Sequence, residues 1–267
     1  MLSKLIKYDL KSTAKLFLLL HGIYLLICIM IRVLYMNRLD FSGETNEMVI
    51  LSLLLLICLM SLLVSALSIF TWLQIAFRFY RHLFSKEGYL SWTLPVSAPQ
   101  HLWGKIISGY ILTAADTIII FAGILILVTG RNVTSAYSLI ADEITGELGF
   151  SITTFGIITL AVCLVSAVGS VIMTYFCIAV GQLFPSHRVL GAVAVYFVTS
   201  FIIQILLIIL MLISGYFPGY EFYTSQDTAG LDFFTRILTL SFGVMLVTTV
   251  GQYIATHYIM KKKINLI

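Results

Sequence analysis

Few residues in this sequence have the types and spacing that chemistry on a bound molecule requires. A phosphate-binding Gly-x-x-x-x-Gly-Lys-Ser/Thr run is absent, so we expect any ATP and Mg²⁺ to be bound by another polypeptide. The spacings His-Glu-x-x-His and Gly-x-Ser-x-Gly are absent too, and the five histidines are scattered. The four cysteines lack metal or redox spacing and are expected to pack as small hydrophobic residues. We therefore predict no enzyme activity, metal site or cofactor in this chain.

One acidic residue, Asp116, lies in the middle of a long apolar run. A charge at the centre of a bilayer costs about 2.5–3.5 kcal/mol on insertion scales, so Asp116 should face protein or water. One interpretation is a proton or cation site in a secondary transporter or channel. The other is a polar anchor to a neighbouring span, assisted by Thr113 and Thr117, and the sequence favours it because ion-coupled carriers usually show several such charges. Other intramembrane polar residues that could line a path or bond helices together are Gln74, Gln204, Gln252 and His21.

A polar block at residues 77–97 separates two strongly apolar stretches. We expect residues 77–84 to extend the preceding helix out of the membrane, with its basic residues facing water. Gly88 permits a break, and Pro95 ends a short amphipathic helix. The simplest interpretation is an interfacial connector whose aromatic rings lie at headgroup level, but this does not explain the carboxylate of Glu87 in a basic surface.

Residues 1–15 are typical of an amphipathic helix at a membrane interface. Its lysines share one helical face and would rest on anionic headgroups, with apolar side chains opposite. Asp9 interrupts the apolar face, and we predict that it pairs with a basic group of the cytoplasmic loops or of a partner. The lysines are Lys4, Lys7, Lys11 and Lys15, and the apolar residues are Leu2, Leu5 and Ile6.

The elements that must position these residues are membrane-spanning helices. Apolar residues make up 60% of the chain and charged residues 10%, with a mean hydropathy of +1.04. Continuous runs of about 20 apolar residues cross a bilayer as helices, whereas a barrel would show alternation. We predict an all-α polytopic membrane protein, a single transmembrane domain over residues 1–267, with spans at about 16–36, 49–76, 106–128, 150–180, 189–214 and 237–260.

The basic residues predict the orientation of these spans. Twelve lie on one side of the six-span arrangement and four on the other, which places both termini in the cytoplasm of a multi-pass cell-membrane protein. The three outer loops are too short to bury a core, and nothing indicates nucleic-acid binding. The twelve are Lys4, Lys7, Lys11, Lys15, Arg78, Arg81, Lys86, Lys105, Arg188, Lys261, Lys262 and Lys263; the four are Arg32, Arg38, Arg131 and Arg236.

Two stretches resemble a known family. Residues 84–97, FSKEGYLSWTLPVS, resemble a block of Gram-positive ABC-type exporter permeases, in which an acidic-Glu-Gly-Tyr-Leu run precedes Thr-Leu-Pro-Val. Residues 175–184, YFCIAVGQLF, resemble the family's exit from the fourth span. With the six spans and the lysine-rich head, the resemblance covers nearly the whole chain. Lys86 departs from it, because an acid is frequent at that position.

The resemblance implies a permease subunit that exports a peptide, a lipid or a drug-like substrate. Residues 77–97, here called the coupling segment, would then carry a helix seated in a groove of a separate ATP-binding subunit. A second permease, identical or homologous, would complete the dimer. The residues expected to dock on the ATP-binding subunit are Lys86, Glu87, Gly88, Tyr89, Leu90 and Trp92.

Overall fold

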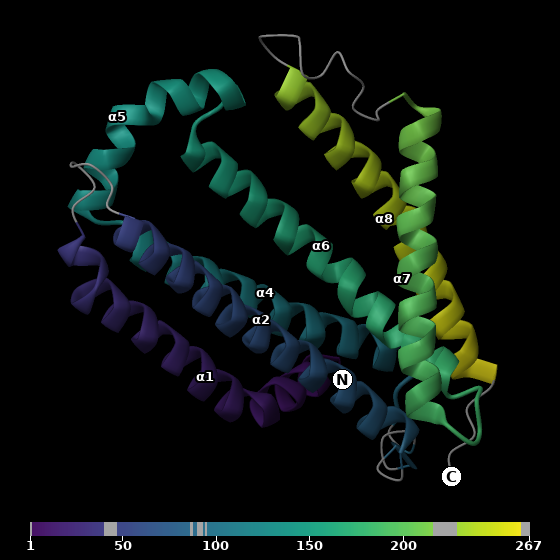
Figure 1. Ribbon diagram of the computed structural model, residues 1–267. Helices are drawn as coiled ribbons and strands as arrows, with labels where there is room; N and C mark the ends of the chain where they lie inside the picture. Colours follow the sequence, from purple (N-terminus) through teal and green to yellow (C-terminus); the bar gives the residue numbers. More distant parts are fainter. Residues whose placement is uncertain are drawn as a thin grey trace.

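The computed structural model describes residues 2–39, 47–85, 88–89, 93, 95–215 and 229–262. Within these ranges every regular element is helical, which confirms the all-α prediction. Figure 1 shows the arrangement. The elements are α1 (Leu2–Leu34), the 3₁₀ turn η1 (Met36–Arg38), α2 (Glu47–Phe84), α4 (Ala98–Val128), α5 (Arg131–Leu148), α6 (Ile152–Gly181), α7 (Arg188–Ile213) and α8 (Ala229–Lys262).

Six of the helices are long and apolar enough to cross a membrane, and they coincide with the six predicted spans. The six are α1, α2, α4, α6, α7 and α8, and α5 is not among them. The second span continues through Phe84 as one helix, as predicted for residues 77–84. The expectation that the basic residues of this stretch face water is wrong for Arg78, whose side chain is 15% exposed and bonds to Asp9. The predicted head helix and the first span form a single unbroken helix, α1.

The helices alternate in direction, so that α1, α4 and α7 start at the same end of the molecule where α2, α6 and α8 finish (Figure 1). We call this end the basic end, because most of the lysines lie there, and the opposite one the acidic end. Helices α1, α2 and α4 form one group and α7 and α8 another. Helix α6 packs against both groups and joins them.

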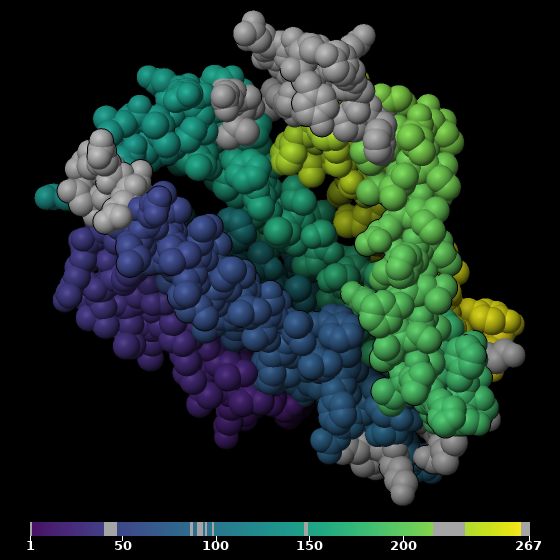
Figure 2. All heavy atoms as spheres, viewed as in Figure 1, coloured from purple at the N-terminus to yellow at the C-terminus, as the bar shows by residue number. Residues whose placement is uncertain are grey.

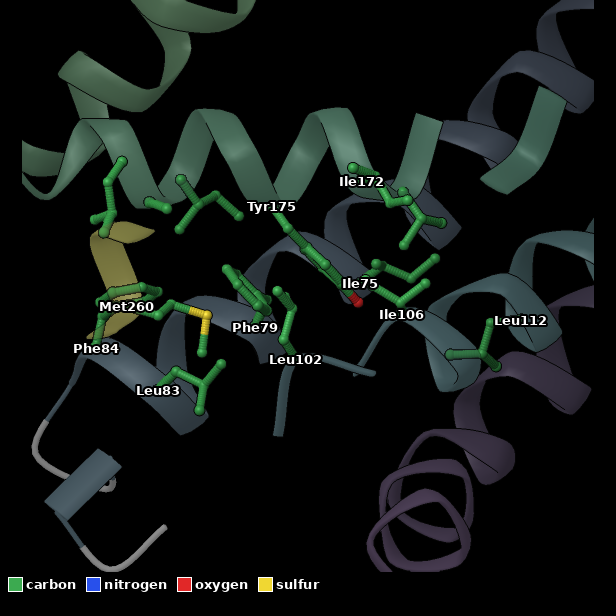
Figure 3. Packing of buried hydrophobic residues seen from close by; sticks show 14 of the residues in the cluster. Ile75, Phe79, Leu83, Phe84, Leu102, Ile106, Leu112, Ile172, Tyr175 and Met260 are labelled. Atoms are coloured by element: carbon green, nitrogen blue, oxygen red, sulfur yellow. The ribbon is translucent and has the colours of Figure 1, made fainter. Parts of the chain in front are cut away.

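The largest hydrophobic core lies toward the basic end and draws residues from five of the spans (Figure 3). Phe79 stacks on Tyr175 with ring centroids 3.9 Å apart, joining α2 to α6. Helix α6 is buried only from Ala167 onward; none of residues 152–166 is buried. Toward the acidic end the two groups therefore separate, and Figure 2 shows the surface hollowed between α2 and α7 with α6 at its floor.

The sequence predicts only a short outer loop where the structure has helix α5. It lies across the acidic end rather than along the spans (Figure 1). Its first residue follows Gly130 in extended conformation, and Gly149 ends it with a φ of 76°, a left-handed value that favours glycine. The loop thus carries an interfacial-type helix without forming a domain of its own.

Candidate functional site

Asp9 lies at the basic end, where α1 crosses the last turns of α2 and the first turns of α4. Lys105 Nζ donates to Asp9 Oδ1 over 2.8 Å, and Ser108 Oγ donates to Oδ2 over 2.6 Å. The guanidinium of Arg78 lies 3.4 Å from Oδ1. Asp9 therefore pairs with basic groups, as predicted, and of these Arg78 lies within the coupling segment and Lys105 on the helix that follows it.

Further hydrogen bonds extend this cluster to a fourth helix. Arg78 Nη1 donates to the backbone carbonyl of Asp9 over 2.5 Å, and Lys105 Nζ lies 2.8 Å from His82 Nδ1. Because an ammonium group can only donate, that imidazole nitrogen accepts. Tyr175 of α6 donates to the Lys105 carbonyl over 3.0 Å. We call Asp9, Arg78, His82, Lys105 and Ser108 the Asp9 cluster.

The apolar face of the first turns of α1 packs on protein instead of facing only lipid. A Cβ on Gly104 of α4 would lie 3.5 Å from Leu2 Cδ1 and 3.8 Å from Leu5 Cβ, so the two helices lie in contact there. The predicted lysine face is exposed, at Lys4, Lys7 and Lys11. The head is therefore amphipathic as predicted, but its apolar side is part of the helix bundle.

Both ends of the coupling segment are anchored in the core. Leu83 and Phe84 end α2 at 1% and 3% exposure, and Leu102 and Ile106 near the start of α4 are at 1% and 3% (Figure 3).

Among the predicted docking residues, the structure describes Gly88 and Tyr89. Gly88 is buried, and Tyr89 is 66% exposed. The amide of Thr93 donates to the Tyr89 carbonyl over 3.2 Å, an α-helical spacing. The remaining four predicted docking residues, Lys86, Glu87, Leu90 and Trp92, lie outside the described residues.

Asp116 is buried at 5% exposure between α1, α2 and α4. Its Oδ1 lies 2.7 Å from His21 Nε2 and accepts from Thr71 over 3.0 Å. Ser68 donates to Oδ2 over 3.2 Å. Both carboxylate oxygens therefore have donors from other helices, which is what a polar anchor requires.

The protonation of this pair follows from its geometry. His21 Nδ1 lies 2.8 Å from the carbonyl of Phe17, which can only accept, so Nδ1 carries a proton. A bare Nε2 facing an ionised carboxylate at 2.7 Å would oppose two lone pairs, so one proton must lie between His21 and Asp116. The pair is neutral overall whether that proton belongs to the histidine or to the acid.

The other residues predicted near Asp116 do not join it. Thr113 and Thr117 donate instead to carbonyls four residues earlier in α4, so their predicted assistance is wrong. Gln204 is exposed on α7. The side-chain oxygen of Gln74 is buried without a hydrogen-bond partner in the described part of the chain.

Arg32 forms a third polar contact that sequence reasoning missed. It is 9% exposed and donates to the Leu127 carbonyl over 2.9 Å and to Asn132 Oδ1 over 3.1 Å. Asn132 in turn donates to the Met36 and Leu39 carbonyls over 2.5 and 3.0 Å. The distribution of basic residues treats Arg32 only as a charge at the outer end of a span. Its position inside the apolar run of α1 was the one sign in the sequence that its side chain is bonded within the protein.

Asp9, His21 and Arg32 are spaced evenly along α1. The steps of 12 and 11 residues correspond to about 18 and 16 Å of helix, together close to the roughly 30 Å of a hydrocarbon core. The His21–Asp116 pair thus lies about midway along α1 between the other two clusters. We call these three contacts between α1 and α4 the polar ladder.

The described residues offer no group of three His, Cys, Asp or Glu side chains that could hold a metal ion. Comparisons with protein-family models, with curated proteins and with solved structures find no match to the chain.

Proposed function

We propose that the chain is the permease subunit of an ATP-binding-cassette exporter. A separate ATP-binding subunit would dock on the coupling segment, and a second permease would face this one. The cargo would be a peptide, a lipid or a drug-like molecule. Hydrolysis of ATP would take place entirely on the partner.

The observation that carries this proposal is the Asp9 cluster. It ties α1 to Arg78 at the end of α2 and to Lys105 at the start of α4, the two helices between which the coupling segment emerges. Leu83 and Leu102 fix the same two helix ends in the core at 1% exposure each. A displacement of the coupling segment would therefore move α1, α2 and α4 together. A segment that transmits the movement of a docked subunit to the spans must meet this requirement.

Switching the access of a cavity needs a second body that moves relative to the first. Helices α7 and α8 meet the α1–α2–α4 group mainly through α6. The separation of the two groups toward the acidic end gives a hollow that closing of the subunits below could widen or narrow (Figure 2). This is alternating access driven from the basic end.

The test is affinity purification in mild detergent from the native cells. We expect the wild-type chain to bring down, in stoichiometric amount, a protein with a Gly-x-x-x-x-Gly-Lys-Ser/Thr sequence. Glu87→Arg should weaken that association at least tenfold, because it reverses the charge expected to fix the register of docking. The matched control is Lys261→Glu, which reverses an exposed charge at the end of α8, outside the coupling segment.

Asp9→Asn separates docking from transmission. We expect the ATP-binding subunit still to copurify, while ATP hydrolysis loses its response to cargo, since the amide cannot neutralise Lys105 and Arg78. If no ATPase accompanies a well-folded wild-type chain, the exporter proposal is wrong. If it accompanies Glu87→Arg as strongly as wild type, docking takes place elsewhere.

A second candidate, a secondary transporter or channel centred on Asp116, is favoured by one observation. A proton-sharing acid–histidine pair lies about midway along α1 between the other two clusters, and such pairs are used in proton relays. Its burial and its three donors favour the anchor instead. Proteoliposomes containing the purified chain alone decide the matter: a proton or cation flux abolished by Asp116→Asn would support the carrier, and no flux would exclude it.

A further inference from the structure

A groove of about 520 Å³ lies at the basic end, between the α6–α7 turn and the first turns of α7. Phe184 and Pro185 of the turn form one wall, and Leu190, Ala194 and Val198 form the other. The α7 residues follow at four-residue intervals, so the groove runs along one face of a membrane-spanning helix. Apart from Ser186 and His187 in the turn, its lining is apolar.

Two glycines hold the turn close to α7. A Cβ on Gly191 would lie 2.9 Å from the ring of Phe184, and a Cβ on Gly181 would lie 2.7 Å from the backbone nitrogen of Ala192. Neither approach leaves room for a larger residue without displacement. The groove is therefore a feature of the backbone path, formed before anything occupies it.

A cationic residue, Arg188, directly follows the groove-lining His187 and has no partner in the described part of the chain. Arg188 begins α7 directly after the turn and is half-buried. Within the described part of the chain its guanidinium has no hydrogen bond or ion pair. His187 beside it is exposed and lines the groove. A half-buried guanidinium is costly unless an anion neutralises it.

We propose that this groove binds one anionic phospholipid of the membrane, with an acyl chain along α7 and the phosphate at Arg188. The positions of the charge and of the apolar lining fit a lipid. Arg188 is the first residue of the span, and the apolar lining extends from there along α7 toward the interior of the membrane. A soluble anion would contact only Arg188 and would leave the apolar lining empty. This proposal is independent of the ATP-driven function, because the groove shares no residue with the coupling segment.

The test uses the full chain reconstituted in nanodiscs that contain equal amounts of phosphatidylglycerol and phosphatidylcholine. Native mass spectrometry after detergent release counts the lipids that stay bound. We expect wild type to retain one phosphatidylglycerol. Ala194→Phe, which places a ring in the groove, should reduce retention at least tenfold. Val193→Phe is the control, because it adds the same ring on the same turn at an exposed position outside the lining.

Arg188→Gln tests the headgroup separately. It should leave a lipid in the groove but abolish the preference for phosphatidylglycerol over phosphatidylcholine. Folding of each variant is checked by size-exclusion elution and helical circular dichroism. The proposal is overturned if Ala194→Phe and Val193→Phe retain equal amounts of phosphatidylglycerol, because the bound lipid is then unspecific. Retention of no phosphatidylglycerol by the wild-type chain would overturn it too.

Discussion

Helices α4 and α7 are both long apolar spans, yet the molecule holds them in different ways. Helix α4, with 31 residues, is bonded to α1 at all three levels of the polar ladder. Helix α7, with 26 residues that are all described, has none buried and no charge after Arg188. It meets α6 through small residues such as Gly181 and Ala192.

The difference lies in what each contact permits. A hydrogen-bonded pair of buried ionisable groups has one favourable geometry, so α1, α2 and α4 can move only as a unit. Contacts between small apolar side chains depend less on one geometry, so we expect α7 to shift on α6 more easily than α1 on α4. The chain thus combines a rigid body with an adjustable one, and α6 is the joint between them.

The largest effect should come from breaking the middle of the polar ladder. Asp116→Ala leaves His21 and Thr71 without their acceptor in an apolar surrounding, and we expect a loss of about 3 kcal/mol of unfolding free energy. Thermal unfolding of the detergent-purified protein, followed by tryptophan fluorescence, measures it. Gln204→Leu, at an exposed polar site of α7, should stay within about 0.5 kcal/mol. Equal losses in the two variants would remove the distinction between the two bodies.

Gly130→Ala should break the ladder at the acidic end. Its Cβ would lie 1.0 Å from Arg32 Nη2, so the guanidinium must leave the Leu127 carbonyl. We expect a loss of about 2 kcal/mol. The same substitution in an Arg32→Met background should cost almost nothing further, and an additive double variant would show that Gly130 acts in some other way.

Gly123→Ala sharpens the comparison through packing alone. The new methyl group would clash with the Tyr24 ring of α1, and overpacking of this kind costs about 1–3 kcal/mol. Gly243→Ala on α8 is the control, since its Cβ would meet nothing within 4 Å. It should be neutral or stabilising by about 0.5–1 kcal/mol, because alanine favours a helix. The same unfolding assay applies to both variants.

The smallest effect is expected on α7. Phe201 is 63% exposed, so Phe201→Leu should change the unfolding free energy by less than about 0.5 kcal/mol. Thermal unfolding in detergent gives the value. A loss above about 1.5 kcal/mol would mean that this face is covered in the purified protein, and α7 would no longer count as the loosely held body.

Hydropathy predicted the six spans because continuous apolar length is a property of each segment alone. The pairing of Asp9 was predictable in kind, since a carboxylate on an apolar face needs a cation. Its partners at Arg78 and Lys105 could not be chosen, because the sequence does not place one helix beside another. The same limit hid the contact of His21 with Asp116, although both were recognised as intramembrane polar residues.

Two features were missed for other reasons. Arg32 was counted for topology, an argument that treats every terminal charge as solvated, whereas the guanidinium is buried against a helix end. Helix α5 lies in a short loop. Hydropathy over the length of a span does not detect it, because its apolar residues are interspersed with polar ones. The docking residues of the coupling segment remain a prediction.

The near-constant separation of 95 to 99 residues between the bonded partners of α1 and α4 has a consequence for biosynthesis. At about 5–20 residues per second, α1 is made roughly 5–20 s before α4 follows it out of the ribosome. During that interval the ionisable side chains of His21 and Arg32 have no partner from α4 in the membrane. We therefore expect the nascent first span to be most exposed to insertion factors and membrane proteases until α4 arrives.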